Sequence, residues 1–252
     1  MGKWLVYSAC AVVVGGAVAT TSGATVPFTE SFSVDSANWM DIASSPVAWI
    51  ASGGAQDGGG YISVDFNFVD STAEDTPALF RAQDEFGSSG GAFEGDWIGD
   101  GVGRFSVFVR HNAGVPLSFY IRFTPVVNFP GALWPSPPPI GPPMAPVPSG
   151  EWTELSFAVS AENPSIWFPE GAGNFASVFG GVGHVQIGVV PPVDLVGVDQ
   201  AVTFDVDTVS ISSGAVPTVS EWGMAVMTLL VLSVGSVAFR RSNPRLAGGV
   251  EA

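Results

Sequence analysis

Cysteine, lysine and histidine are nearly absent from this 252-residue chain, which has one cysteine, one lysine and two histidines. Only four of its eight basic residues lie within residues 25–214, against 21 of its 23 acidic residues, all but Glu221 and Glu251. A body this acidic repels phosphate backbones, which argues against nucleic acid as a partner. The single cysteine, Cys10, lies in the N-terminal segment, so the body has no disulfide framework, no cysteine nucleophile and no thiolate zinc cluster.

Long amphipathic helical patterns are also missing from residues 25–213. Short runs rich in Val, Ile, Phe and Thr stand there between clusters of Gly, Pro, Asn and Asp, which is typical of strands and turns. We expect strands at residues 61–68, 104–110, 116–123, 151–160, 184–190 and 201–211. Residues 111–115 are expected to close a hairpin between two of them. The fold class predicted for residues 25–213 is all-β, an antiparallel, jelly-roll-like β-sandwich.

One segment of the body, residues 125–150, holds ten of the 20 prolines. Proline removes backbone donors, so we expect a polyproline-like surface loop rather than a strand. Phe129, Leu133 and Trp134 would give it an apolar tip. The loop is either a rigid spacer that packs over a sheet edge or a recognition loop.

The N-terminus has the three-part layout of a secretory signal peptide over residues 1–24. Lys3 precedes an apolar stretch, and small residues follow it, with cleavage expected after Ala19 or Ala24. Signal peptidase is therefore an expected partner. An uncleaved anchor helix is the alternative, although Gly15 and Gly16 interrupt the apolar run.

The C-terminal region has the features of a membrane anchor. Residues 222–239 carry no charge and would span about 27 Å as a helix, enough to cross a bilayer core. Ser220 and Glu221 suit a helix start, and Arg240 and Arg241 follow the apolar run as expected on the cytoplasmic side. The alternative is a buried core helix. A short polar tail, residues 242–252, ends the chain.

The stretch "VPTVSEWG", followed by an apolar helix and "RR", resembles the IPTL-CTERM sorting signal, a relative of the PEP-CTERM class of Gram-negative bacteria. The resemblance covers residues 214–241 and implies that an exosortase-type membrane transpeptidase recognises the segment, removes its helix and passes the body to the cell surface. Such signals usually end within a few residues of the arginines, whereas here a longer tail follows. The sorting residues that it implies are Val216, Pro217, Thr218, Val219, Ser220, Glu221, Trp222, Arg240 and Arg241.

Three phrases of the body resemble secreted bacterial carbohydrate-binding modules of the galactose-binding-like, jelly-roll type. They are "FTESFSVDSANW", "PSGEWTELSFAV" and "VTFDVDTVSI". The last is similar to the closing strand of those modules, in which an aspartate, here Asp207, precedes a Val-Ser-hydrophobic triplet. The resemblance implies the same fold class and a polysaccharide as ligand.

Alternation along the expected strands predicts a polar and aromatic sheet face. Aromatic platforms among planar hydrogen-bonding groups suit sugars, whose faces are apolar and whose rims carry hydroxyls. If the strands share one sheet, the face is a candidate ligand site, and otherwise it is an ordinary solvated face. Its members are Phe108, Arg110, Tyr120, Arg122, Trp152, Glu154, His184 and Gln186.

Glu30 lies in the first of the three phrases that resemble carbohydrate-binding modules, and Asp205 and Asp207 lie in the last one. We expect these two phrases to contribute the first and last strands of the body, which are neighbours in many jelly rolls. Carboxylates are the ligands that calcium prefers, and the resembling modules often hold a structural calcium there. These carboxylates therefore predict a structural calcium ion as cofactor, and a solvated acidic surface is the alternative.

No motif fixes a catalytic constellation, since neither histidine stands beside a serine elbow or in metal spacing. We therefore expect a non-catalytic protein, exported as a membrane-anchored precursor and then placed at the surface or in the extracellular matrix of a Gram-negative-type bacterium, where it binds polysaccharide on one sheet face. A purely structural matrix protein without small ligand is one alternative. A polysaccharide hydrolase or lyase on a jelly-roll scaffold is the other.

Overall fold

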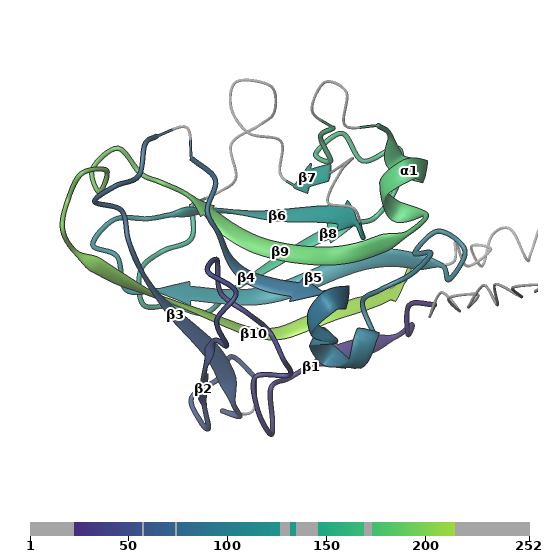
Figure 1. The fold of residues 1–252 in the computed structure, drawn as a ribbon, viewed down its shortest axis with the longest axis horizontal. Helices are drawn as coiled ribbons and strands as arrows, with labels where there is room; N and C mark the ends of the chain where they lie inside the picture. The colour runs from purple at the N-terminus through teal and green to yellow at the C-terminus, as the bar shows by residue number, and fades with distance from the viewer. Residues whose placement is uncertain are drawn as a thin grey trace, which may run out of the picture.

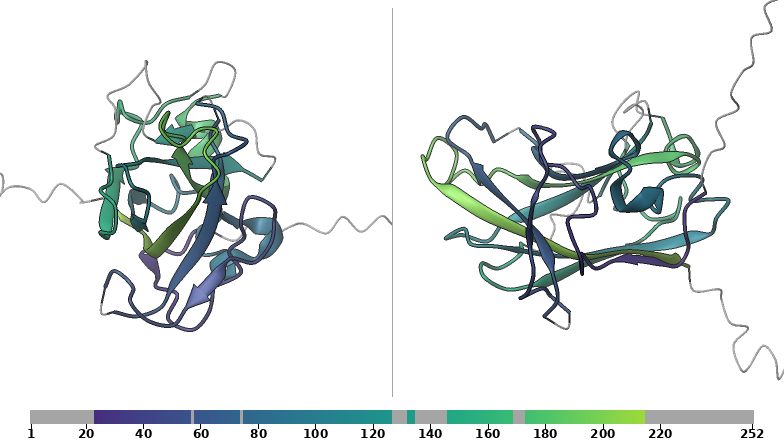
Figure 2. Two further views of the ribbon diagram at one scale, coloured as in Figure 1. Left: turned by 90° about the vertical axis from the view of Figure 1, so that its left-hand side faces the viewer. Right: turned by 60° about the horizontal axis from the view of Figure 1, so that its bottom comes forward.

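The computed structural model describes residues 23–56, 58–73, 75–126, 132–134, 146–168 and 173–214. Two antiparallel sheets pack face to face in this part of the chain, with one short α-helix and two 3-10 turns beside them (Figures 1 and 2). The predicted all-β antiparallel sandwich is therefore confirmed. No helix among these residues is long and apolar enough to cross a membrane. The expected signal peptide up to residue 22, the sorting segment 215–241 with its helix 222–239, and the polar tail lie outside the described residues.

The larger sheet has the strand order β2-β3-β10-β5-β8, and β1 also pairs with β10. Its strands are β1 (Phe28–Glu30), β2 (Ala48–Ile50), β3 (Tyr61–Asn67), β5 (Val102–His111), β8 (Thr153–Ala158) and β10 (Ala201–Ser213). The last strand of the body thus lies in the middle of the sheet, between β3 and β5, and beside the first strand. This neighbourhood of first and last strands agrees with the sequence-based expectation.

The smaller sheet has the order β4-β9-β6-β7. Its strands are β4 (Ala78–Gln83), β6 (Ser118–Pro125), β7 (Ala132–Trp134) and β9 (Val182–Val190). The 3-10 turns η1 (Asp84–Phe86) and η2 (Ser88–Gly91) follow β4 directly, and α1 (Phe175–Phe179) precedes β9.

The core lies between the sheets, where the predicted alternation is confirmed. Phe105, Val107 and Val109 of β5 are fully buried, and so are the alternate residues of β6 and β9. The centre holds Trp97, whose ring lies 5.3 Å from that of Phe123 and 5.9 Å from that of Phe179. A period of two places every second side chain of a strand on the same face, which is why the pattern was readable in the sequence.

The expected hairpin across residues 111–115 is wrong. β5 belongs to the larger sheet and β6 to the smaller one, so this connection crosses from one layer to the other. Ala113 is completely buried, and the Nε2 atom of His111 lies 3.0 Å from the carbonyl oxygen of Val147. His111 and Ala113 are buried while Asn112 and Gly114 are exposed, so the connection is anchored in the protein as it passes from one layer to the other.

The proline-rich segment contains a strand that was not expected. Ala132–Trp134 forms β7 and pairs with Ile121, Arg122 and Phe123 of β6. This tripeptide lies between Pro130 and Pro135 and has no proline, so its backbone donors are available for pairing. Residues 127–131 and 135–145 of the segment, with the proposed tip residue Phe129, lie outside the described residues.

Candidate functional site

Three side chains meet on the outer face of the larger sheet, two from strands and one from the residue that precedes β8. Arg110 of β5 lies with its guanidinium carbon 5.0 Å from the ring centroid of Tyr61 in β3 and 4.4 Å from that of Trp152, just before β8. The two rings contact each other edge to face, with centroids 5.6 Å apart. Cation–π contact and ring contact hold the three groups as one unit.

A buried carboxylate fixes the arginine from the other side. Asp205 of β10 faces Arg110 in the strand register. Its Oδ2 atom accepts a hydrogen bond from Nε of Arg110 at 2.9 Å and forms an ion pair with Nη2, also at 2.9 Å. The aspartate side chain is 9% exposed and the arginine side chain 24%. Because the ion pair neutralises both charges, the cluster presents aromatic surface and polar edges with little net charge.

The next row of the same face carries Asp207, Phe108 and Glu154, which are register partners across β10, β5 and β8. Phe108 is half-buried and Glu154 is exposed. We call Tyr61, Phe108, Arg110, Trp152 and Glu154 the aromatic–arginine face. It combines flat apolar rings with charged groups at their rims.

Asp207 connects this face to the glycine-rich loop before β3. Its Oδ2 accepts a hydrogen bond from the Ala55 nitrogen at 2.7 Å, and the Trp152 indole donates to the Gly53 carbonyl at 3.1 Å. A Cβ at Gly54 would lie 2.5 Å from Asp207 Oδ2, so the close approach requires glycine. Burial raises the pKa of Asp207, because desolvation outweighs the backbone hydrogen bonds that favour its charged form.

The other four residues of the predicted ligand face lie elsewhere, so the condition for a single ligand face, that all of its strands share one sheet, is not met. Tyr120, Arg122, His184 and Gln186 lie on β6 and β9 of the smaller sheet, where Arg122 faces Gln186 in the register. The residues of the predicted ligand face are therefore divided between the two outer surfaces of the sandwich. The physical reason is the crossing after β5, which sends β6 and β9 into the second layer.

These four side chains are also less exposed than a solvated face predicts. Tyr120 is 4% exposed, its hydroxyl donates to the Thr76 carbonyl, and burial raises its pKa to about 12. Gln186 is 2% exposed and accepts a hydrogen bond from Nε of Arg122 at 2.7 Å. The ring of Tyr120 packs across Gly188, where a Cβ would lie 2.3 Å from the ring.

The three carboxylates expected for calcium do not converge. Glu30 accepts from the Phe32 nitrogen at 3.1 Å, while Asp205 binds Arg110 and Asp207 binds the loop before β3. Among the residues that the structure describes, the one group of three potential ligands whose atoms lie within 4.8 Å of one another is formed by other side chains.

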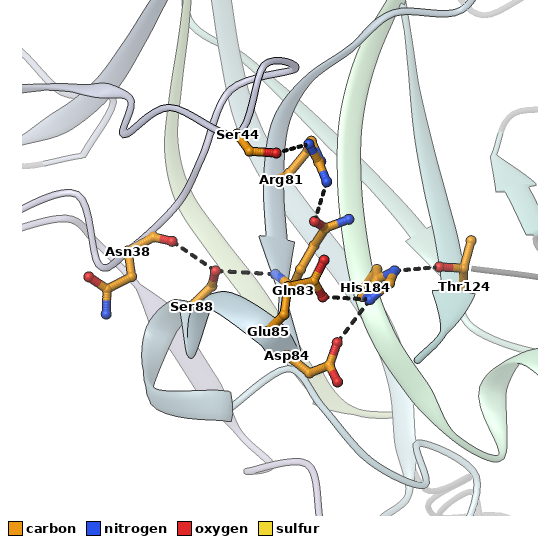
Figure 3. A network of polar contacts seen from close by, with 9 residues as sticks. All are labelled: Asn38, Ser44, Arg81, Gln83, Asp84, Glu85, Ser88, Thr124 and His184. Atoms are coloured by element: carbon orange, nitrogen blue, oxygen red, sulfur yellow. Dashed lines mark hydrogen bonds and ion pairs between the residues drawn. The ribbon is translucent and has the colours of Figure 1, made fainter. Parts of the chain in front are cut away.

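That group consists of Asp84, Glu85 and His184, which join η1 to the start of β9 (Figure 3). His184 Nε2 lies 2.9 Å from Asp84 Oδ1 and 3.1 Å from Glu85 Oε2, and its Nδ1 lies 2.9 Å from the Thr124 hydroxyl. His184 is 1% exposed, whereas the Asp84 and Glu85 side chains are 27% and 48% exposed. The sequence predicted His184 as part of a ligand face but gave no sign of Asp84 and Glu85. These acids follow Gln83 directly, and only the pairing of Gln83 with His184 between β4 and β9 brings them to the histidine.

Comparison with known proteins gives one family match. Residues 215–242 match the IPTL-CTERM motif, in agreement with the resemblance seen in the sequence. The motif implies an exported, membrane-anchored precursor and processing by an exosortase-type enzyme. No curated protein matches the chain.

The solved structures that are similar to the chain include the following two. One holds the CBM22-1 and GH10 modules of Clostridium thermocellum endo-1,4-beta-D-xylanase 10B in complex with xylohexaose, at 18% identity and a TM-score of 0.42. The match covers 77% of this chain and 30% of that one, so the chain spans less than a third of the xylanase structure. The other is the L4b domain of human laminin alpha-2, at 9% identity and a TM-score of 0.42, with 75% of this chain and 98% of that domain covered.

Proposed function

We propose that this protein is a non-catalytic component of the bacterial envelope or extracellular matrix, and that it binds polysaccharide at the aromatic–arginine face. Its C-terminal motif accounts for export and sorting, and the final position at the surface of a Gram-negative-type cell is part of the proposal. The observation that carries the binding function is the mutual contact of Tyr61, Arg110 and Trp152.

The chemistry of the face favours an uncharged polysaccharide. Pyranose rings have apolar faces that pack on aromatic side chains, and their hydroxyls bind planar charged groups. Arg110 is already neutralised by Asp205, and the exposed Glu154 adds negative charge beside it. A uronic acid or sulfated chain would meet repulsion from this acidic body, whose formal charge over the whole chain is −15.

The test is binding of the full-length chain, purified in detergent, to an array of neutral polysaccharides and to their insoluble forms. Trp152→Ala removes the ring that contacts Arg110 most closely. We expect it to weaken binding about 30-fold, because aromatic hot spots contribute about 2 kcal/mol or more.

Trp49→Ala is the matched control. Trp49 is also a partly exposed tryptophan whose indole donates to a backbone carbonyl, that of Phe32 at 2.7 Å. It pairs with Ile62, so its side chain lies on the opposite side of the sheet from Tyr61. Equal loss in both variants would refute binding at the aromatic–arginine face. Binding of no polysaccharide would favour the purely structural alternative, and turnover of one would favour the hydrolase or lyase.

Sorting has its own measurement, which is intact-mass spectrometry of the protein recovered from the envelope and medium of its host. We expect a body that starts near residue 20 or 25 and ends near the segment 216–222. A species that retains residues 222–252 at the cell surface would contradict removal of the helix.

A further inference from the structure

We propose that Asp84, Glu85 and His184 form a binding site for a divalent transition metal ion, with zinc as the expected occupant. The site lies on the outer side of the smaller sheet and is separate from the aromatic–arginine face. It does not depend on polysaccharide binding.

The first argument is the number of groups that converge on one nitrogen. Nε2 of His184 has two carboxylate oxygens at 2.9 and 3.1 Å, from Asp84 and Glu85. A ring N–H is a single donor, so it can satisfy only one of these acceptors well. A cation bound by the nitrogen lone pair and both oxygens would satisfy all three groups at once.

The second argument is the position of the other ring nitrogen. Nδ1 of His184 lies 2.9 Å from the hydroxyl oxygen of Thr124, which is 2% exposed. When Nδ1 carries the proton and donates to this oxygen, the Nε2 lone pair points at the two carboxylates. Metal-binding histidines are usually oriented in this way by a partner on the second nitrogen.

The third argument is the local charge. Glu94 lies close enough that its pKa is raised, first by burial and then by the charges of Asp84 and Glu85. Arg81, the nearest arginine in the sequence, instead donates to the Ser44 hydroxyl and to Gln83, as Figure 3 shows. A divalent cation would offset the repulsion among the three carboxylates.

The geometry needs little adjustment for zinc. Zinc binds histidine nitrogen and carboxylate oxygen at about 2.0–2.2 Å, so tetrahedral ligands lie about 3.3 Å apart. The two contacts of His184 with Asp84 and Glu85 would therefore lengthen by a few tenths of an ångström. The partly exposed acids in η1 can make this shift, and His184 is held in β9 between β4 and β6. Calcium prefers six to eight oxygen ligands and magnesium keeps its waters, so both fit an imidazole-centred site poorly.

The chain offers a direct readout because it has only two histidines. The full-length chain is labelled with 15N-histidine, purified in detergent, stripped of metal with EDTA and titrated with zinc chloride. Calcium and magnesium are present at about 1 mM, a concentration that occupies weak sites on surface carboxylates. We expect one zinc ion per chain and a shift of the His184 Nε2 signal. His111 is the internal reference, because its Nε2 bonds the Val147 carbonyl and its Nδ1 accepts from the Ala113 nitrogen.

Variants separate this site from loose binding to acidic surface. Glu85→Gln should weaken zinc binding at least about tenfold, and Thr124→Val by about 10–100-fold, the range for partners of metal-binding histidines. Glu151→Gln removes an exposed acid of the same type outside the cluster and should leave affinity unchanged. An unshifted His184 signal at saturating zinc would overturn the proposal. So would equal losses in Glu85→Gln and Glu151→Gln, or a response to calcium alone.

Discussion

The ion pair of Arg110 with Asp205 predicts an asymmetric response to removal of each partner. Asp205 is 7% exposed as a residue, so Arg110→Met leaves a buried carboxylate without its cation. In Asp205→Asn the guanidinium stays on the rings of Tyr61 and Trp152 and keeps part of its surface in water. Removal of the arginine should therefore cost more than removal of the aspartate charge.

The size of each effect follows from the contacts. Removing one partner of a fully buried ion pair lowers the free energy of unfolding by about 3–5 kcal/mol. Because the Arg110 side chain is 24% exposed and water screens the pair in part, we expect about 2–3 kcal/mol here. The two cation–π contacts add about 0.5–1 kcal/mol each, of which methionine retains a part through its packing on the rings. We expect a loss of about 3 kcal/mol for Arg110→Met and about 1–1.5 kcal/mol for Asp205→Asn, which keeps an acceptor oxygen.

Urea unfolding of the full-length chain in detergent measures these differences, followed by intrinsic fluorescence. The double variant should recover part of the loss of Arg110→Met, because no carboxylate is left without a partner. Arg104→Met is the control, since Arg104 lies exposed on the same strand and should change stability by less than about 0.5 kcal/mol. Equal costs for the two single variants, or a larger cost for Asp205→Asn, would refute the reasoning.

Three further predictions concern packing and charge. Trp97→Ala should lower the unfolding free energy by about 3–5 kcal/mol, since the ring is fully buried, and a loss under about 1 kcal/mol in urea unfolding would contradict it. Gly188→Ala should lower the melting temperature because a Cβ would overlap the Tyr120 ring, whereas Gly181→Ala, with open space, should not. The raised pKa of Asp207 means that the folded state binds its proton more tightly than the unfolded state. The stability that Asp207 contributes is therefore largest below pH 3.8, its ordinary pKa, and is lost as pH rises through its pKa in the folded state. The melting temperature of the wild type should therefore fall relative to that of Asp207→Asn between pH 3.5 and pH 7. The opposite trend would show that the backbone hydrogen bonds dominate.

The two outer faces of the sandwich differ in kind, which separates the two proposals. The aromatic–arginine face is built from half-buried rings around a neutralised ion pair. The cluster around His184 is built from carboxylates that converge on an imidazole nitrogen. Loss of zinc binding in Glu85→Gln should therefore leave polysaccharide binding unchanged, and Trp152→Ala should leave zinc binding unchanged.

The predicted ligand face shows that alternation predicts which face of a strand a residue lies on, but not which strands are neighbours. Phe108 and Arg110 were placed on the outer face of their strand, and the structure agrees. Alternation also puts Tyr61 on the face opposite the buried Ile62, yet nothing in the sequence indicates that it contacts Trp152, which lies 91 positions later. That contact needs β10, the last strand, to lie between β3 and β5. Alternation is a local property of one strand, whereas the order of strands is set by contacts between distant segments.

The cluster around His184 also could not be predicted from the sequence. Asp84 and Glu85 follow β4, a strand that the sequence pattern did not reveal, since ALFRAQ is buried on nearly every residue and does not alternate. Thr124, from β6, completes the surroundings of His184. Three segments that are 40 to 100 positions apart therefore build one site, and no spacing motif describes it.

The sequence by itself determined the fold class, most strands and their core-facing residues, and the sorting motif at residues 215–242. Each of these depends on the order of residues within one short segment: a period of two for strands, and a contiguous motif for sorting. Only the tertiary structure decided that β5 and β6 part into different sheets, that Arg110 and Arg122 lie on opposite surfaces, and that His184 meets two acids. These outcomes depend on which apolar faces bury each other, and that free energy belongs to the packed sandwich as a whole rather than to any one strand.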